Sequence, residues 1–153
     1  MSGLMRIGEV VERVGYSFRT IRYYEEVGLV TPSGRTPGGF RLYTEVDVQR
    51  LVVLKRMKPL GFSLDEMRRL LGVLDALDGR VASETPREEL LDRLDAFRAD
   101  ADTRVQELRG KLAVAEEFAQ RLRDEAADRS GDRSRERAQD APAAGAPPGA
   151  AAP

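Results

Sequence analysis

Hydrophobic side chains recur every three or four residues at the start of the chain, a spacing typical of short amphipathic helices. The first run, residues 7–14 ("IGEVVERV"), places its apolar side chains on one face and is followed by Gly15, a common helix stop. Ser17 then occupies the N-cap position of a second helix that extends to about Val27. Two short helices around a glycine-containing turn predict a helix-turn-helix over about residues 8–27.

The pattern changes from helical to alternating at residues 35–43 ("RTPGGFRLY"), where the "PGG" triplet supplies a turn. Apolar and polar side chains alternate after that turn, which predicts a β-hairpin. Capping boxes that begin at Thr44 and Ser63 predict two further helices. We therefore expect a mainly α fold: a winged helix-turn-helix domain over residues 5–74, with a small β-hairpin as its wing.

A single long helix is predicted over residues 86–126, after a linker of residues 75–85. Its apolar positions alternate spacings of three and four over more than four heptads, the pattern of a coiled coil, with Arg98 as an exception within the stripe. A lone helix of this length cannot bury such a seam, so we expect it to dimerise. The expected dimerisation residues are Leu91, Leu94, Ala101, Val105, Leu108, Leu112, Ala115, Ala119 and Leu122.

The last part of the chain, residues 127–153, is rich in aspartate, arginine and serine and ends in "APAAGAPPGAAAP". It has almost no large apolar side chains, so burial cannot offset the entropy lost on ordering. We expect this segment to be a disordered, low-complexity tail.

Composition narrows the chemistry that the protein can perform. The sequence contains no cysteine and no histidine, which removes thiolate and imidazole metal ligands, cysteine nucleophiles and histidine acid–base catalysts. Together with the lack of a glycine-rich phosphate loop, this makes an enzyme the least favoured class, and we expect no catalytic residue, metal or cofactor. No apolar run approaches the roughly 18 residues that a membrane span needs, so a soluble, cytoplasmic protein is expected.

Charge is distributed unevenly, although the net charge is only −1. Residues 1–75 carry 12 lysines and arginines against 9 acids, whereas residues 76–153 carry 13 against 17. The imbalance is modest and does not by itself indicate a nucleic-acid partner. The positions of the basic residues carry more information than their number.

The second predicted helix presents a polar face made by Arg19, Arg22, Tyr23 and Glu26, which fall at helical spacing. Arginine can form two hydrogen bonds to a phosphate or a guanine, and tyrosine can bond a phosphate. Periodicity places the neighbouring Tyr24 on the opposite, packing face. An ordinary surface pair between Arg22 and Glu26, beside a half-buried tyrosine, explains the same pattern equally well.

Two further basic clusters favour a nucleic-acid surface. Arg35 and Arg41 lie on the predicted hairpin, which suits a wing that touches the sugar–phosphate backbone. Arg56 and Lys58 follow Lys55 at the end of the next helix. A solvated hairpin tip and cations that favour a helix C-terminus are the structural alternatives. Three separated basic clusters in one small domain nevertheless indicate a continuous phosphate footprint.

The chain resembles the MerR-type winged-helix transcription regulators over roughly residues 5–73. The matching motifs are "IGEV", "SFRTIRYYEEVGL", the wing "GFRLY" and "LGFSLDE", in this order. The resemblance implies an antiparallel coiled-coil homodimer that binds a pseudo-palindromic promoter. It further implies that binding distorts a promoter whose polymerase-recognition elements are spaced too far apart, so that RNA polymerase can use it.

Residues carried over from the resemblance define the expected DNA contacts. It assigns both tyrosines of the recognition helix to the DNA surface, whereas periodicity favours Tyr23 alone. The expected recognition-helix residues are Ser17, Arg19, Thr20, Arg22, Tyr23 and Tyr24, the first-wing residues are Arg35, Gly39, Arg41 and Tyr43, and the second-wing residues are Arg56 and Lys58.

The chain also departs from the family it resembles. Metal- and redox-sensing relatives place cysteines near the dimer helix, and multidrug-sensing relatives append a ligand-binding domain; this sequence shows neither. The effector is therefore open: there is none, or a small ligand or a protein partner binds at the helix junction near residues 75–86. Two other functions stay open, a coiled-coil protein-interaction adaptor and an architectural DNA-binding protein without promoter selectivity.

Overall fold

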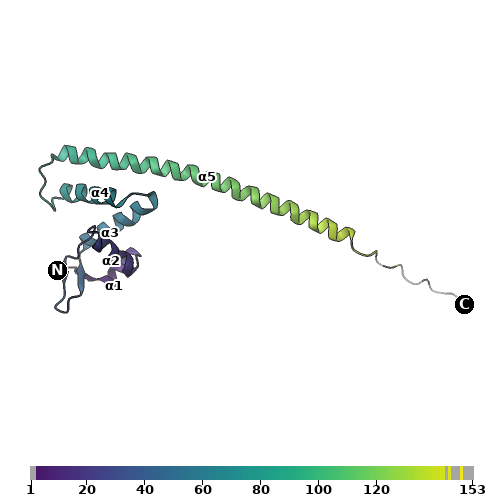
Figure 1. The fold of residues 1–153 in the computed structure, drawn as a ribbon, viewed down its shortest axis with the longest axis horizontal. Helices are drawn as coiled ribbons and strands as arrows, with labels where there is room; N and C mark the ends of the chain where they lie inside the picture. The colour runs from purple at the N-terminus through teal and green to yellow at the C-terminus, as the bar shows by residue number, and fades with distance from the viewer. Residues whose placement is uncertain (1–2, 144, 146–148, 150–153) are drawn as a thin grey trace. The chain divides into compact units, whose positions relative to one another are not determined.

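The computed structural model describes residues 3–143, 145 and 149 and is mainly helical (Figure 1). It divides into two compact units, with the boundary between Gln106 and Glu107. The elements in chain order are β1 (Met5–Arg6), α1 (Ile7–Val14), α2 (Phe18–Glu26), β2 (Gly34–Arg35), β3 (Arg41–Tyr43), α3 (Glu45–Met57), the 3-10 turn η1 (Lys58–Leu60), α4 (Leu64–Leu77) and α5 (Arg87–Gln139).

The predicted helix-turn-helix is formed by α1 and α2. Gly15 ends α1 at a φ of 76°, a left-handed conformation that a side chain would strain. The Ser17 hydroxyl then caps α2 by accepting a hydrogen bond from the backbone N–H of Thr20 at 3.1 Å. Val10 and Ile21 are fully buried where the two helices pack into the common core.

The wing is a three-stranded antiparallel sheet in the order β1-β3-β2, one strand more than the sequence predicts. β1 pairs with β3 so that Met5 lies opposite Tyr43, and β2 pairs with β3 so that Arg35 lies opposite Arg41. Gly39 completes the turn at a φ of 82°. A two-residue strand is too short to show alternation, which is why periodicity does not reveal β1.

Both predicted capping boxes are present. Thr44 and Asp47 cap α3, and Ser63 and Glu66 cap α4, each through reciprocal side-chain and backbone hydrogen bonds. Asp47 is the one buried charged residue in the described part of the chain, and it also accepts a hydrogen bond from the Ser33 hydroxyl at 2.6 Å. The caps therefore fix where α3 begins after the wing and where α4 begins after η1.

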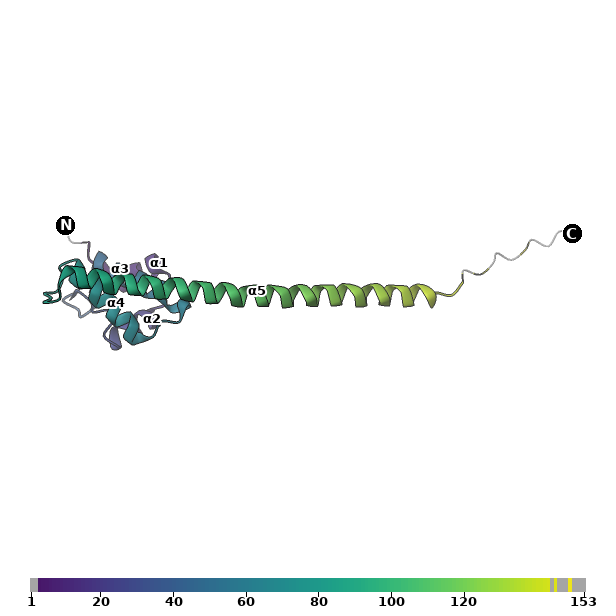
Figure 2. The same cartoon turned by 90° about the horizontal axis from the view of Figure 1, so that it is seen from above.

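The first turns of α5 run alongside α4, as Figures 1 and 2 both show. Leu90 is buried, and Phe97 and Ala101 pack against the core. Arg104 stacks over the Phe62 ring at 4.0 Å from its centroid. The start of α5 is therefore part of the first unit and is not a free coiled-coil strand.

α5 is longer than the sequence predicts. Just before it begins at Arg87, the backbone N–H of Thr85 donates to the Ser83 hydroxyl at 3.2 Å. At its end, the helix continues to Gln139 and does not stop near residue 126. Ion pairs one turn apart, such as Arg129 with Glu125 at 3.0 Å, support this extension, which apolar periodicity does not register.

The remainder of the expected tail lies mostly outside the described residues, which omit 144, 146–148 and 150–153. No helix in the described part of the chain combines the length and apolar character that a membrane crossing requires. The division of the chain into a DNA-binding domain, a linker and a dimerisation helix stays a prediction.

Candidate nucleic-acid interface

The outer face of α2 carries the polar stripe that the sequence predicts. Arg19, Arg22, Tyr23 and Glu26 are all exposed, with Tyr23 45% accessible. Within the described residues, neither arginine has an acidic group within ion-pair distance. Arg22 does not pair with Glu26, so the structure does not support the alternative of a simple surface ion pair. The face presents two unpartnered guanidinium groups beside an exposed phenol.

The two expected contacts Tyr24 and Tyr43 lie in the core, so the structure contradicts their assignment to a DNA-facing surface. Tyr24 is 2% exposed and Tyr43 0% exposed. The Tyr24 ring packs against those of Tyr16 and Tyr23 at centroid distances of 5.8 and 5.7 Å. Burial raises the pKa of Tyr43 to about 12, and the charge of Glu25 adds to this rise. Both side chains support the surface from beneath.

Glu25 connects the recognition helix to the wing, and the sequence analysis assigned it no role. The Arg41 Nε atom lies 2.8 Å from Glu25 Oε1 and 2.7 Å from Oε2. The Tyr43 hydroxyl donates to the same carboxylate at 3.4 Å. The hydrogen bond with Glu25 raises the pKa of Arg41. Arg41 is therefore tied to α2, and its first role is to fix the wing beside the helix.

Replacing Glu25 with glutamine is expected to loosen the wing, because it removes the charge that holds Arg41 while keeping the side-chain size. Backbone amides of β2 and β3 should exchange with deuterium faster than in the wild type, and those of α4 should not. Glu26→Gln is the matched control, since Glu26 is exposed and has no ion-pair partner in the described residues. Equal exchange rates in the two variants would contradict the role of Glu25.

The tip of the wing is organised by Arg35 and Gly39. The Arg35 Nη1 atom donates to the Gly39 carbonyl at 3.0 Å, and the turn is closed by a backbone hydrogen bond from Gly39 to Thr36 at 2.8 Å. Arg35 remains exposed and is free of ion pairs in the part of the chain that the structure describes. Gly39 thus shapes the loop, and Arg35 supplies its positive charge.

The second basic cluster divides into one structural and two free cations. The Lys55 Nζ atom donates to the Val14 carbonyl and lies 5.6 Å from the Tyr16 ring centroid, so it joins α3 to the end of α1. Arg56 and Lys58 are exposed, and no acid within the described residues pairs with them. These two remain available to contact a phosphate.

Ser17 and Thr20, two more of the expected DNA contacts, form the cap at the start of α2. The Ser17 and Thr20 hydroxyls are hydrogen-bonded to each other at 2.9 Å. Phe18, next to them, is 47% exposed and is a large apolar side chain that the polar pattern did not single out. The exposed aromatic group and the capped N-terminal turn lie at the same end of α2.

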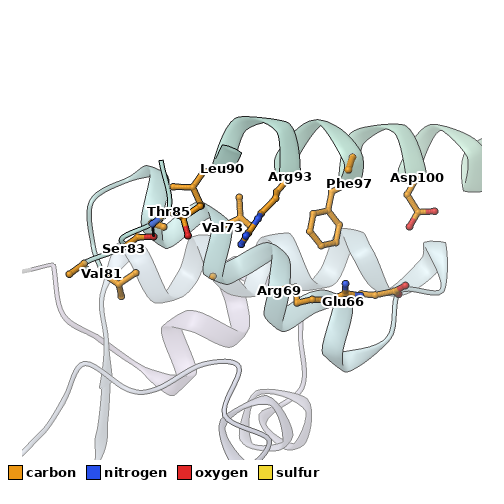
Figure 3. A pocket seen from close by; sticks show the side chains of 14 residues that line it. Glu66, Arg69, Val73, Val81, Ser83, Thr85, Leu90, Arg93, Phe97 and Asp100 are labelled. Atoms are coloured by element: carbon orange, nitrogen blue, oxygen red, sulfur yellow. Dashed lines mark hydrogen bonds between the residues drawn. The ribbon is translucent and has the colours of Figure 1, made fainter. Parts of the chain in front are cut away.

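A separate cavity of about 690 Å³ lies between α4 and the first turns of α5 (Figure 3). Phe97 points into it from α5, Val73 lies on α4, and Glu66 and Asp100 mark one end. The other end is formed by residues 81–83 and 85, so the helix junction that the sequence analysis proposed for an effector lines this cavity. Binding of an effector there stays a prediction.

Comparison with known proteins identifies the chain's relatives. The pattern that describes the MerR HTH family regulatory proteins matches residues 5–73. The HTH-type transcriptional regulator YfmP of Bacillus subtilis is 33% identical over 124 residues, which cover 78% of this chain and 88% of YfmP. The mercuric resistance operon regulatory protein of Bacillus cereus is 49% identical over 70 residues, covering 46% of this chain and 53% of that protein.

Solved structures show the same relationship. HiNmlR, described as a MerR family regulator lacking the sensor domain and bound to promoter DNA, aligns with a TM-score of 0.55 at 28% identity, covering 71% of this chain and 78% of that one. A MerR family transcriptional regulator from Listeria monocytogenes aligns with a TM-score of 0.58 at 25% identity, covering 89% and 95% of the two chains.

These results define a winged helix-turn-helix protein with a long C-terminal helix. The chain belongs to the MerR family of helix-turn-helix regulatory proteins. It spans about half the length of the first curated relatives that it matches.

Proposed function

We propose that this protein is a sequence-specific, DNA-binding regulator of transcription that acts as a homodimer. The observation that carries the proposal is the exposed face of α2, where Arg19, Arg22 and Tyr23 lie without an acidic partner among the described residues. A fixed wing adjoins this helix through the Glu25–Arg41 ion pair. A relative of the same fold is bound to promoter DNA in its solved structure.

Each basic group has a distinct proposed task. Arg19 and Arg22 read base edges or position the recognition helix on the DNA backbone, because arginine can form paired hydrogen bonds with guanine or phosphate. Arg35 at the wing tip and Arg56 and Lys58 at the second cluster neutralise phosphates and set the register on the duplex. Arg41 contributes mainly by holding the wing, since its guanidinium already faces Glu25.

Dimerisation is proposed to occur through the seam of α5. Three of its leucines, Leu108, Leu112 and Leu122, are between 42% and 57% exposed in the single chain. Pairing two such helices would bury these side chains and present two recognition helices to a pseudo-palindromic site. Half-sites separated by about 34 Å, one helical turn, or a multiple of it are expected. We also propose that binding of the dimer distorts the promoter so that RNA polymerase can use it.

The test of this function is to sequence the genomic DNA that the purified protein retains, followed by competition with random duplex. A regulator should recover a paired, inverted motif and prefer it to random DNA by roughly 10³-fold or more. Retention without preference would indicate an architectural DNA-binding protein instead. Failure to retain duplex DNA at moderate salt would leave the adaptor role and overturn the proposal.

Arg22→Ala is expected to weaken binding to the recovered site about tenfold or more, because it removes a charge-assisted contact to phosphate or base. A phosphate contact would reduce the slope of log affinity against log salt by about one, whereas a base contact would also relax the sequence preference. Arg133→Ala is the control, since Arg133 is also an exposed arginine and lies on α5, outside residues 5–73. Equal losses in both variants would remove α2 from the interface.

A further inference from the structure

The cavity between α4 and the first turns of α5 is bracketed at both ends by arginines of α5 (Figure 3). Near the helix junction, the Arg87 Nη1 atom donates to the Leu77 carbonyl of α4 at 3.1 Å. At the opposite end, the Arg104 Nη2 atom donates to Glu66 of α4 at 3.2 Å and to Asp100 of its own helix at 3.1 Å. Because both arginines join α4 to α5, the cavity is formed without a ligand, as small-molecule sites usually are.

The inner wall of the cavity is apolar. Val73 of α4 and Leu90 of α5 line it, and both are buried. The Phe97 ring points into the space from α5, and Val81, which is half exposed, lies at the junction end (Figure 3). A flat apolar group that packs among these side chains would remove apolar surface from water, which is the main source of affinity in such sites.

Gly72 leaves the α4 wall of the cavity without a side chain. It lies inside α4, where glycine destabilises a helix relative to alanine. Its φ is not positive, and a Cβ atom added there would meet no heavy atom within 4 Å beyond its neighbours in the helix. Neither the backbone nor the packing therefore requires glycine. Open space at a cost to the helix is expected where a ligand needs room.

The two acids that line the cavity already have partners. Glu66 and Asp100 share the Arg104 guanidinium, and the backbone N–H of Ser63 also donates to Glu66 at 2.7 Å. The Ser63 hydrogen bond is the largest cause that holds the pKa of Glu66 below its ordinary value, and the charge of Arg104 adds to it. The acidic end of the cavity is therefore neutralised within the protein and does not need a cationic ligand.

The two cations that line the cavity differ in this respect. Arg93 of α5 pairs with Glu89 on its own helix at 2.6 Å. Arg69 of α4 has no acid within ion-pair distance in the part of the chain that the structure describes. One unmatched positive charge thus remains at an apolar cavity. A guanidinium binds a carboxylate through paired, charge-assisted hydrogen bonds, so the ligand that suits this site is an amphipathic carboxylate.

Arg104 connects the cavity to the second basic cluster. Its Nη1 atom donates to the Leu60 carbonyl, at the end of η1, at 3.2 Å. η1 begins at Lys58, one of the two cations proposed to contact phosphate. The side chain that closes one end of the cavity therefore also holds the segment that carries this cation.

We propose that the cavity binds a small amphipathic carboxylate, with the acid on Arg69 and a flat apolar group against Phe97, and that its occupation strengthens DNA binding. A ligand that contacts both α4 and α5 favours the arrangement in which Arg104 joins them to η1, and it shifts the population toward that arrangement. The regulatory step rests on the proposed DNA-binding function, whereas the ligand site does not.

Calorimetric titration of the full chain without DNA tests the site, with naphthoate as the probe. Naphthalenemethanol and naphthalenemethylamine carry the same ring with a neutral or a positive head group. Naphthoate is expected to bind about tenfold more tightly than either, since one charge-assisted contact is worth about this factor. A preference for the amine, equal binding of all three probes, or no binding of naphthoate would each overturn the proposal.

Gly72→Leu tests whether the probe occupies this cavity, because leucine fills the space from α4 and removes no charge. Naphthoate affinity should fall about tenfold or more, while the thermal midpoint should not fall, since leucine is the better helix former. Gly131→Leu is the matched control, because it makes the same change inside α5 and outside the cavity. Equal naphthoate affinity in the two variants would contradict the site. Arg69→Gln should abolish the preference for naphthoate over the alcohol.

The regulatory step is tested by titrating the recovered DNA site with and without saturating naphthoate. The probe should tighten DNA binding about threefold or more, and DNA should tighten naphthoate binding by the same factor, because the coupling is reciprocal. Arg104→Lys keeps the positive charge but lacks the planar fork that reaches both acids and the Leu60 carbonyl, so it should bind naphthoate and lose the coupling.

The possible failures are distinguishable. Naphthoate that binds the wild type without tightening its binding to DNA would overturn the regulatory step alone. A wild type that binds no DNA would refute the proposed function and the regulatory step with it, while the calorimetric result would still decide the site.

Discussion

Tyr24→Ala is expected to unfold the DNA-binding domain, whereas Tyr23→Ala is expected to leave it folded and weaken DNA binding. Tyr24 is 2% exposed, and replacing a buried aromatic side chain with alanine costs about 3–5 kcal/mol. A small domain has only about 5–15 kcal/mol of stability in total, so most of it would be lost. Tyr23 is 45% exposed, and a surface substitution of this kind changes stability by less than about 1 kcal/mol.

Urea unfolding followed by circular dichroism gives the stability of each variant, and titration with the recovered DNA site gives its affinity. Tyr24→Phe separates the two possible roles of that residue, because it keeps the packing and removes only the hydroxyl. It should match the wild type in both measurements. A variant Tyr24→Phe that folds normally but loses DNA affinity would restore Tyr24 to the interface and contradict its assignment to the core.

The contrast between the two tyrosines shows which part of the site was predictable. Helical periodicity separated Tyr23 from Tyr24 correctly, because it reports which face of a helix meets the core. The family resemblance assigned both to DNA and was wrong for Tyr24. Tyr43 is buried because its side chain packs into the helical core and its hydroxyl reaches Glu25 of α2, contacts between distant residues that a hairpin pattern does not reveal.

Local signals predicted the element boundaries well. The N-caps Ser17, Thr44 and Ser63 lie where the sequence places them, because a cap depends on residues within one turn. Contacts between distant residues were not predictable in this way. The Glu25–Arg41 pair joins residues 16 apart, and no spacing rule for a single helix or strand relates them.

The packing of α5 is a second example of contacts that local sequence patterns do not predict. The coiled-coil pattern predicts a seam, but it does not reveal the flank on which Leu90, Phe97 and Arg104 pack within the first unit. These residues directly precede seam positions, so the apolar character of Leu90 and Phe97 was a usable signal. Ala101 belongs to both surfaces, since it is a seam residue and also packs against the core. One helix thus serves the domain and the proposed dimer on adjacent faces.

Leu108→Asp is expected to separate the proposed dimer and, with it, to abolish tight DNA binding. Leu108 lies on the seam of α5 through which dimerisation is proposed, so each dimer would bury two uncompensated carboxylates. An unpaired buried charge costs several kcal/mol, and the dimer dissociation constant should rise at least about 100-fold. The single chain should stay folded, because Leu108 is 42% exposed there.

Sedimentation and DNA titration on the same samples connect the two effects. A monomer engages one half-site and loses the added affinity that comes from linking two recognition helices. Val114→Asp introduces the same charge about 1.7 turns further along α5, away from the seam, and should leave dimer and DNA affinity unchanged. DNA binding that survives undiminished in monomeric Leu108→Asp would show that one winged domain suffices, and the seam would then serve a partner other than a second copy.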